Sequence, residues 1–115
     1  MRVHHVALTT TDVEGIAAFY RDVLGLEEQT RHHDEAGLRS VWLRLDGSTL
    51  MIERGASGSG GWHLLALEID PRSRESWRVR LVEASAYTHH SAYTIYGRDP
   101  DDNPFGLSHF PERGG

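Results

Sequence analysis

The sequence contains no cysteine, which excludes disulfide bonds and thiolate chemistry. A chain without cysteine is compatible with a reducing compartment, and we expect a cytoplasmic location. No apolar run approaches the ~20 residues that are needed to span a bilayer. No stretch resembles a signal peptide either. We therefore expect no membrane partner.

Basic side chains are in the minority, with 12 against 17 acidic ones and a net charge of −5 at pH 7. Nucleic-acid phosphates and anionic lipids repel such a chain, so we expect no nucleic-acid partner. Hydrophobic residues make up only 38% of the sequence, which requires a strongly polar surface. A length of 115 residues predicts a single domain, residues 1–115.

Histidine, in contrast, is abundant, with eight residues. Six of them form adjacent pairs: His4-His5, His32-His33 and His89-His90. Neighbouring residues of a strand point to opposite faces of the sheet. We therefore expect that no adjacent pair binds a metal ion together.

Two stretches, nearly half the chain apart, look alike. His5 opens an apolar stretch at the start of the chain, and His63 opens another within residues 61–70. This similarity indicates a duplicated module. The first module covers about 1–54 and the second about 62–112. A glycine-rich linker, residues 55–61, joins them.

Each module is predicted to contain a strand, a helix and three further strands. In the first module the strands are 3–10, 26–33, 38–45 and 48–53, and the helix runs from the capping pattern Thr11–Glu14 to Gly25. In the second module the strands are 61–70, 87–90, 92–98 and 105–110, and the helix starts at Pro71 with a buried stripe of Trp77, Leu81 and Ala84. This order predicts an α+β fold with two small antiparallel sheets, each backed by one helix.

His5 and His63 are placed alike in the two modules, on the face away from the helix. Glu53 ends a strand on the matching face. Taken singly, each has a plain structural explanation, as a hydrogen-bonded histidine or a solvated glutamate. Together, two imidazoles and one carboxylate are sufficient to hold a divalent metal ion with open coordination positions.

Three further stretches are distinctive: Asp12-Val13 at the start of the first helix, Phe19-Tyr20-Arg21-Asp22-Val23-Leu24-Gly25-Leu26, and Arg98-Asp99-Pro100-Asp101. With His5-Val6-Ala7-Leu8, they make the sequence resemble the vicinal oxygen chelate (VOC) superfamily over essentially its whole length. That superfamily includes glyoxalases, extradiol dioxygenases, fosfomycin-resistance enzymes and bleomycin-resistance proteins. The resemblance implies paired βαβββ modules that curl round a concave cavity. It also implies a homodimer.

The resemblance places metal ligands on the first and last strands of each module, at His5, Glu53, His63 and Gly106. Glycine has no side chain that binds a metal. His109, three residues further on, has the opposite strand parity and is expected to face the helix. The module repeat relates position 53 to position 106, so three ligands remain. They would hold a divalent ion, with iron, zinc, nickel and manganese left open.

We expect the cavity to be lined by Trp62, Leu65, Leu67, Tyr93 and Gly106. The first functional hypothesis is a metalloenzyme of lyase, isomerase or dioxygenase type, in which the ion binds two oxygens of a small substrate and acts as a Lewis acid. It would not be a glyoxalase I, because one of the two glutamates of that enzyme type is missing. The alternative is a metal-free, bleomycin-resistance-type protein that sequesters an aromatic or glycopeptide ligand. A third is a catalytically silent regulatory subunit.

Overall fold

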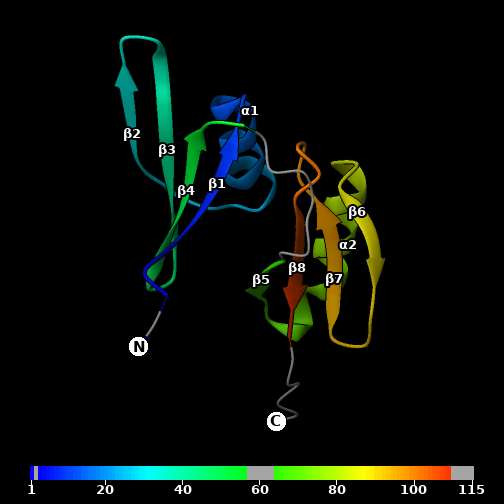
Figure 1. Ribbon diagram of the computed structural model, residues 1–115. Helices are drawn as coiled ribbons and strands as arrows, with labels where there is room; N and C mark the ends of the chain where they lie inside the picture. The colour runs from blue at the N-terminus through cyan, green and yellow to red at the C-terminus, as the bar shows by residue number, and fades with distance from the viewer. Residues whose placement is uncertain (2, 57–63, 110–115) are drawn as a thin grey trace. The chain divides into compact units, whose positions relative to one another are not determined.

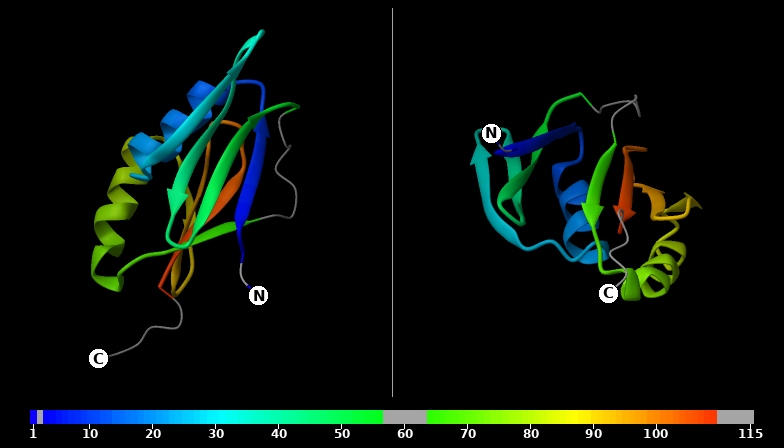
Figure 2. Two further views of the ribbon diagram at one scale, coloured as in Figure 1. Left: turned by 90° about the vertical axis from the view of Figure 1, so that its left-hand side faces the viewer. Right: turned by 90° about the horizontal axis from the view of Figure 1, so that it is seen from below.

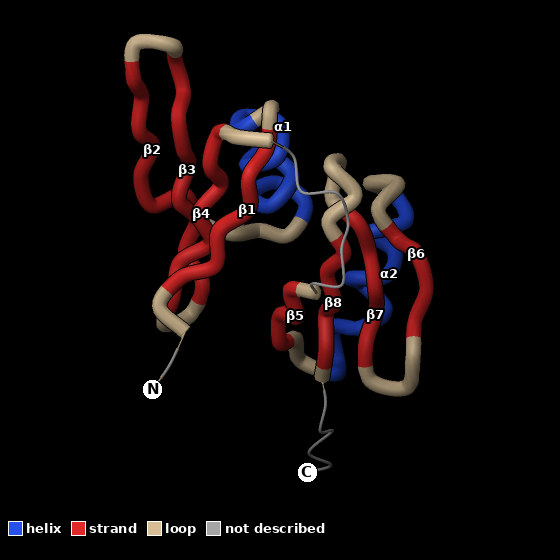
Figure 3. Tube along the Cα trace, in the orientation of Figure 1, coloured by secondary structure: helices blue, strands red, loops and turns tan. Residues whose placement is uncertain are grey.

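The computed structural model describes residues 1, 3–56 and 64–109 (Figure 1). The chain divides into two compact units, Met1–Ser59 and Gly60–Gly115, and the division falls inside the predicted linker. Within the described residues, each unit contains a four-stranded sheet and helical segments on one face of it (Figures 2 and 3). The predicted α+β fold with repeated βαβββ modules is therefore confirmed. Trp62 and His63 lie outside the described residues.

The first unit contains β1 (His5–Thr10), α1 (Val13–Ala18), the π-helical segment η1 (Phe19–Val23), β2 (Glu28–Asp34), β3 (Gly37–Leu45) and β4 (Ser48–Arg54). Its sheet has the order β1-β4-β3-β2. β1 is parallel to β4, whereas the other two pairings are antiparallel. The sheet is therefore mixed, and the prediction of a purely antiparallel sheet was wrong. The helical segments lead the chain from β1, at one edge of the sheet, to β2 at the other edge. Two hairpins then bring β4 beside β1 in the same direction.

The first helix begins one residue later than the capping pattern predicts. Asp12, and not Thr11, is the N-cap, since its carboxylate accepts a hydrogen bond from the Gly15 amide at 3.0 Å. The helix widens into η1 before it ends at Leu24. Gly25 follows with a φ of +78°, a left-handed conformation that favours glycine and confirms its predicted role at the helix end.

The core of the first unit lies between α1 and one face of its sheet. The alternation in β3 and β4 turns Val41, Leu43, Leu50 and Ile52 to this face, and each is fully buried. Ile16, Ala17 and Tyr20 cover them from the helical side. The opposite face carries the alternating residues Ser40, Trp42, Arg44, Met51 and Glu53, as the sequence pattern predicts.

The second unit contains β5 (Leu65–Glu68), the 3₁₀ segment η2 (Pro71–Ser73), α2 (Arg74–Glu83), β6 (Tyr87–His90), β7 (Thr94–Arg98) and β8 (Pro104–Ser108). Its sheet repeats the first in the order β5-β8-β7-β6, with β5 parallel to β8. The predicted stripe on α2 was only partly right, since Leu81 is buried but Trp77 is half-buried and Ala84 is exposed. Within the described ranges, no helix is long and apolar enough to cross a membrane.

Asp70 caps η2, and its hydrogen bonds predict how the stability of the fold depends on pH. Its carboxylate accepts hydrogen bonds from the Arg72 side chain at 2.9 Å and the Arg72 amide at 2.8 Å, and these lower the pKa of Asp70 from 3.8 to about 2. Because the folded pKa is the lower one, the stabilisation is complete above the unfolded pKa and is lost as pH falls through about 2. We expect an NMR titration of this carboxyl to show a midpoint near 2, and Arg72→Ala to raise it towards 3.8. An unchanged midpoint in that variant would contradict this assignment.

Candidate functional site

We call the side of each sheet turned away from its helical segment the open face. On the first sheet, paired residues form rows that cross the strands on this face. One row contains His5, Thr49 and Arg44; the next contains Ala7, Met51, Trp42 and Thr30; the third contains Thr9, Glu53, Ser40 and His32. His5 and Glu53 share the open face, as the sequence predicts, but they lie in different rows.

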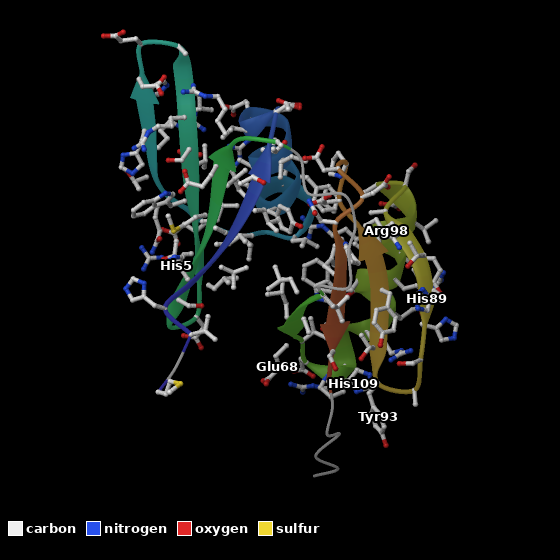
Figure 4. All side chains as sticks on the ribbon, viewed as in Figure 1. His5, Glu68, His89, Tyr93, Arg98 and His109 are labelled. Atoms are coloured by element: carbon white, nitrogen blue, oxygen red, sulfur yellow. The ribbon has the colours of Figure 1, made fainter. Side chains whose placement is uncertain are left out.

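The strand register separates His5 from Glu53. His5 pairs with Thr49, and Glu53 pairs with Thr9, so the two lie at opposite ends of the β1–β4 pair (Figure 4 labels His5). Four residues of strand correspond to about 13 Å, and strand side chains stand roughly perpendicular to the sheet. The structure therefore does not bring this pair together. Among the described residues, no group of three or more His, Cys, Asp and Glu side chains is placed to hold a metal ion.

On the second sheet, Gly106 lies on the open face, between Ala66 of β5 and Tyr96 of β7. A Cβ at this position would lie 3.0 Å from Thr94 Cγ2 and 3.6 Å from the Tyr96 ring. Tyr96 in turn stacks on the His89 ring, with centroids 4.4 Å apart and planes 12° from parallel. The backbone of Gly106 is thus packed against an aromatic surface, and the position offers no metal ligand.

The last strand of each unit carries two candidate positions on its open face. These are Met51 and Glu53 in the first unit, and Gly106 and Ser108 in the second. Because strand side chains alternate with a period of two, position 106 has the same parity as both 51 and 53, and the predicted correspondence between positions 53 and 106 stays a prediction.

The two helix caps differ in parity relative to the open face. Asp12 lies five residues after the open-face residue Ala7, whereas Asp70 lies four residues after the open-face residue Ala66. Leu64, two residues before Ala66, is 48% exposed.

Two predicted cavity residues lie on the other side of the second sheet. Leu65 and Leu67 pair with Phe105 and Leu107, which are buried in the core, so they share the core face. Tyr93 lies in the turn before β7 and packs edge-on against His109, with ring centroids 5.8 Å apart (Figure 4). Of the predicted lining residues that the structure describes, Gly106 lies on the open face.

His109 faces the helix, as its strand parity predicts. Its side chain is buried, and Arg74 at the start of α2 donates a hydrogen bond from Nη1 to its Nε2 at 2.8 Å. Arg74 also donates to the carbonyl oxygen of Ser91 at 2.7 Å. His109 therefore joins the helix to the β6–β7 turn and does not take the place of an acidic ligand at position 106.

Sequence patterns did not indicate Trp42 and His32 as a pair on the open face of the first sheet. Their ring centroids are 4.9 Å apart. Trp42 Nε1 and His32 Nε2 are both buried, and neither has a hydrogen-bond partner in the described part of the chain. The alternation of Ser40, Trp42 and Arg44 assigns Trp42 to this face, but the bulge in β2 hides the position of His32 from sequence reasoning.

Comparisons with known proteins agree with this architecture. The profile of the Glyoxalase/Bleomycin resistance protein/Dioxygenase superfamily matches residues 2–110, and the chain belongs to this superfamily. No curated protein sequence matches the chain.

Solved structures with the same fold include a fosfomycin resistance protein, FosX, from Listeria monocytogenes, with 19% identity and a TM-score of 0.81, covering 94% of this chain and 90% of that one. Lactoylglutathione lyase from Agrobacterium tumefaciens has 20% identity and a TM-score of 0.75, covering 98% and 96%. A FosX structure complexed with Mn(II) and sulfate has 20% identity and a TM-score of 0.81, covering 95% and 91%. At this level of identity the likeness shows the fold alone.

Proposed function

We propose that this chain is a small-molecule-binding protein of the superfamily whose binding does not depend on a protein-held metal ion. The observation that carries the proposal is the pair of rows that contain Met51 and Gly106. Gly106 has no side chain where the resemblance implies a metal ligand, and Met51 on the open face of the first sheet offers only a thioether. Neither Gly106 nor Met51 therefore offers an oxygen or imidazole ligand to a divalent ion.

The open faces supply what an organic ligand needs instead. The first carries Trp42 and Met51 in one row, and the second carries Tyr96 stacked on His89 above Gly106. Ligand sites are commonly apolar and aromatic with a few polar groups, and a flat ring gains about 0.5–1.5 kcal/mol from stacking on an aromatic side chain. These aromatic side chains support a ligand that is aromatic or carries an aromatic group. Such a ligand agrees with the alternative hypothesis of a metal-free, bleomycin-resistance-type binding protein.

The metal site of His5, Glu53 and His63 is the second candidate. It is favoured by the exposure of His5 and by the carboxylate of Glu53 on the same open face. Such an ion, whether iron, zinc, nickel or manganese, would supply Lewis-acid chemistry towards substrate oxygens.

A homodimer and a cytoplasmic location are proposed with either function. Light scattering that gives the mass of a monomer at micromolar concentration would refute the dimer.

A binding measurement with and without chelator separates the two functions. We expect bleomycin or the fluorescent probe anilinonaphthalene sulfonate to bind equally well in the presence of EDTA. Tyr96→Ala and Trp42→Ala should each weaken binding roughly 3- to 10-fold, as the loss of an aromatic contact predicts. Tyr93→Ala, an aromatic change at the turn beside His109, is the matched control and should have little effect. Binding or turnover that is lost in both EDTA and Glu53→Ala would reject this proposal in favour of the metalloenzyme.

A further inference from the structure

A cavity of about 330 Å³ lies where the open face of the first sheet meets the β3–β4 turn. Its lining combines Arg44 and Thr49 of the open face with Gln29 of β2, the turn residues 45–48, and His4 ahead of β1. Most of these side chains are polar. Such a lining suits a charged or strongly hydrogen-bonding part of a ligand, because a hydrocarbon group would leave the polar side chains without partners.

Arg44 supplies a positive charge to this cavity. Its side chain is 58% exposed, and its Nε lies 4.0 Å from a carboxylate oxygen of Glu27, which is longer than a hydrogen bond. Arg31 is held far more tightly, with Nη2 2.7 Å from Glu28 Oε1 and Nη1 2.9 Å from Glu14 Oε2. The planar guanidinium of Arg44 is therefore available to a ligand, and it fits a carboxylate, sulfonate or phosphate group through two parallel hydrogen bonds.

The neighbours of Arg44 include further hydrogen-bond donors. Thr49 donates from its hydroxyl to Gln29 Oε1 at 3.0 Å, which turns the amide nitrogen of Gln29, a donor, away from Thr49. Asp46, in the turn, also lines the cavity, and its carboxylate repels an anion. Because the whole chain has a net charge of −5, an anion is held here by short-range contacts with Arg44 and not by the overall field.

The cavity lies beside the aromatic part of the same open face. Trp42 and Arg44 are two residues apart on β3 and share this face, so their Cα atoms are separated by about 6.8 Å. Met51 lies in the row of Trp42, and its thioether makes favourable contacts with aromatic rings. We propose that the ligand is an aromatic anion, with its ring against Trp42 and Met51 and its acidic group on Arg44. This inference rests on the proposed function and adds the charge of the ligand to it.

The test compares two fluorescent dyes on the untagged full chain. Anilinonaphthalene sulfonate and phenylnaphthylamine share one ring system, and only the first carries an anionic group. Arg44→Ala should weaken binding of the sulfonate dye about 10-fold, as the loss of a charge-assisted hydrogen bond predicts, and change that of the neutral dye by less than about 2-fold. Arg44→Lys keeps the charge without the guanidinium fork, so its affinity for the sulfonate dye should be intermediate. Trp42→Ala should weaken binding of both dyes.

Two further variants serve as controls of opposite kinds. Arg39 is an exposed arginine on β3 whose parity assigns it to the other face, and Arg39→Ala should change the affinity for neither dye. Asp46→Asn removes the nearby negative charge and leaves an Asn-Gly pair, which suits a hairpin turn. It should strengthen binding of the sulfonate dye by about 2-fold, within the usual range of an exposed charge pair.

The outcomes separate this inference from the proposed function. If both dyes bind but Arg44→Ala changes neither affinity, or weakens both equally, the inference is overturned and the proposed function stands. A loss in Arg39→Ala as large as that in Arg44→Ala would also overturn it, since it would show nonspecific attraction to arginine. If neither dye binds the wild type, both the inference and the proposed function are rejected. Thermal unfolding of each variant checks that the fold is retained.

Discussion

Replacing Phe105 with alanine is expected to lower the free energy of unfolding by about 3–5 kcal/mol, the usual cost of removing a buried phenylalanine side chain. Phe105 is fully buried in the middle of the second sheet. Its ring lies directly over Gly97, where a Cβ would be only 2.6 Å from Cζ. The neighbouring backbone is held in place by the hydrogen bond from the Arg98 amide to the Ala86 carbonyl oxygen at 2.9 Å, so the site collapses poorly around the cavity.

Leu64→Ala is the matched control, because Leu64 is 48% exposed at the edge of the same unit. We expect its effect to stay within ~0.5 kcal/mol, as for most surface substitutions. Chemical denaturation monitored by circular dichroism gives both values. A loss below about 1 kcal/mol in Phe105→Ala would mean that the second unit is not built around this ring.

The second large effect concerns catalysis. With Ni(II) or Zn(II) supplied, the protein is expected not to isomerise the methylglyoxal–glutathione hemithioacetal at enzyme-like rates, which are about 1–10³ per second. Loss of a general base typically costs ~10²–10⁴-fold, and a base must lie within about 2.6–3.2 Å of the proton that it removes. Neither Gly106 nor Met51 provides such a group.

Consumption of the hemithioacetal is followed with an active lactoylglutathione lyase as the positive control. Gly106→Glu should not restore turnover, since even a Cβ would lie 3.0 Å from Thr94 Cγ2. Fast turnover by the wild type would show that acidic groups outside the rows of Met51 and Gly106 do the chemistry. It would also remove the physical basis for a metal-free function.

Much of the fold could be predicted from local patterns. The alternation from Leu38 to Leu45 and the Asp46-Gly47 turn predicted β3, β4 and their faces, because a strand with one buried face has a strong period of two. The parallel pairing of β1 with β4 could not be predicted in this way. This pairing depends on how the chain runs through two hairpins, and local residue propensities contain no information about that path.

The candidate site was harder to predict from the sequence, since it depends on the register between neighbouring strands. His5 and Glu53 were assigned correctly to one face, but sequence periodicity carries no information on which row each occupies. Leu65 and Leu67 were assigned to the cavity because they follow His63 at even spacing. Their pairing with Phe105 and Leu107 places them on the core face of the sheet instead. Similarly, the side chains of His4 and His5 were expected to point to opposite faces, but their Nδ1 atoms lie 3.0 Å apart. The alternation does not apply to His4, because it precedes the first residue of β1.

The one-residue difference between the two strand-to-helix connections has an evolutionary meaning. In duplicated modules, a single codon gained or lost ahead of a helix cap moves every upstream strand residue to the opposite side of the sheet. Open-face positions are exchanged for core positions in one genetic event, with no point substitution. The stretches from Ala7 to Asp12 and from Ala66 to Asp70 differ in length by one residue, which is the difference that such an event leaves.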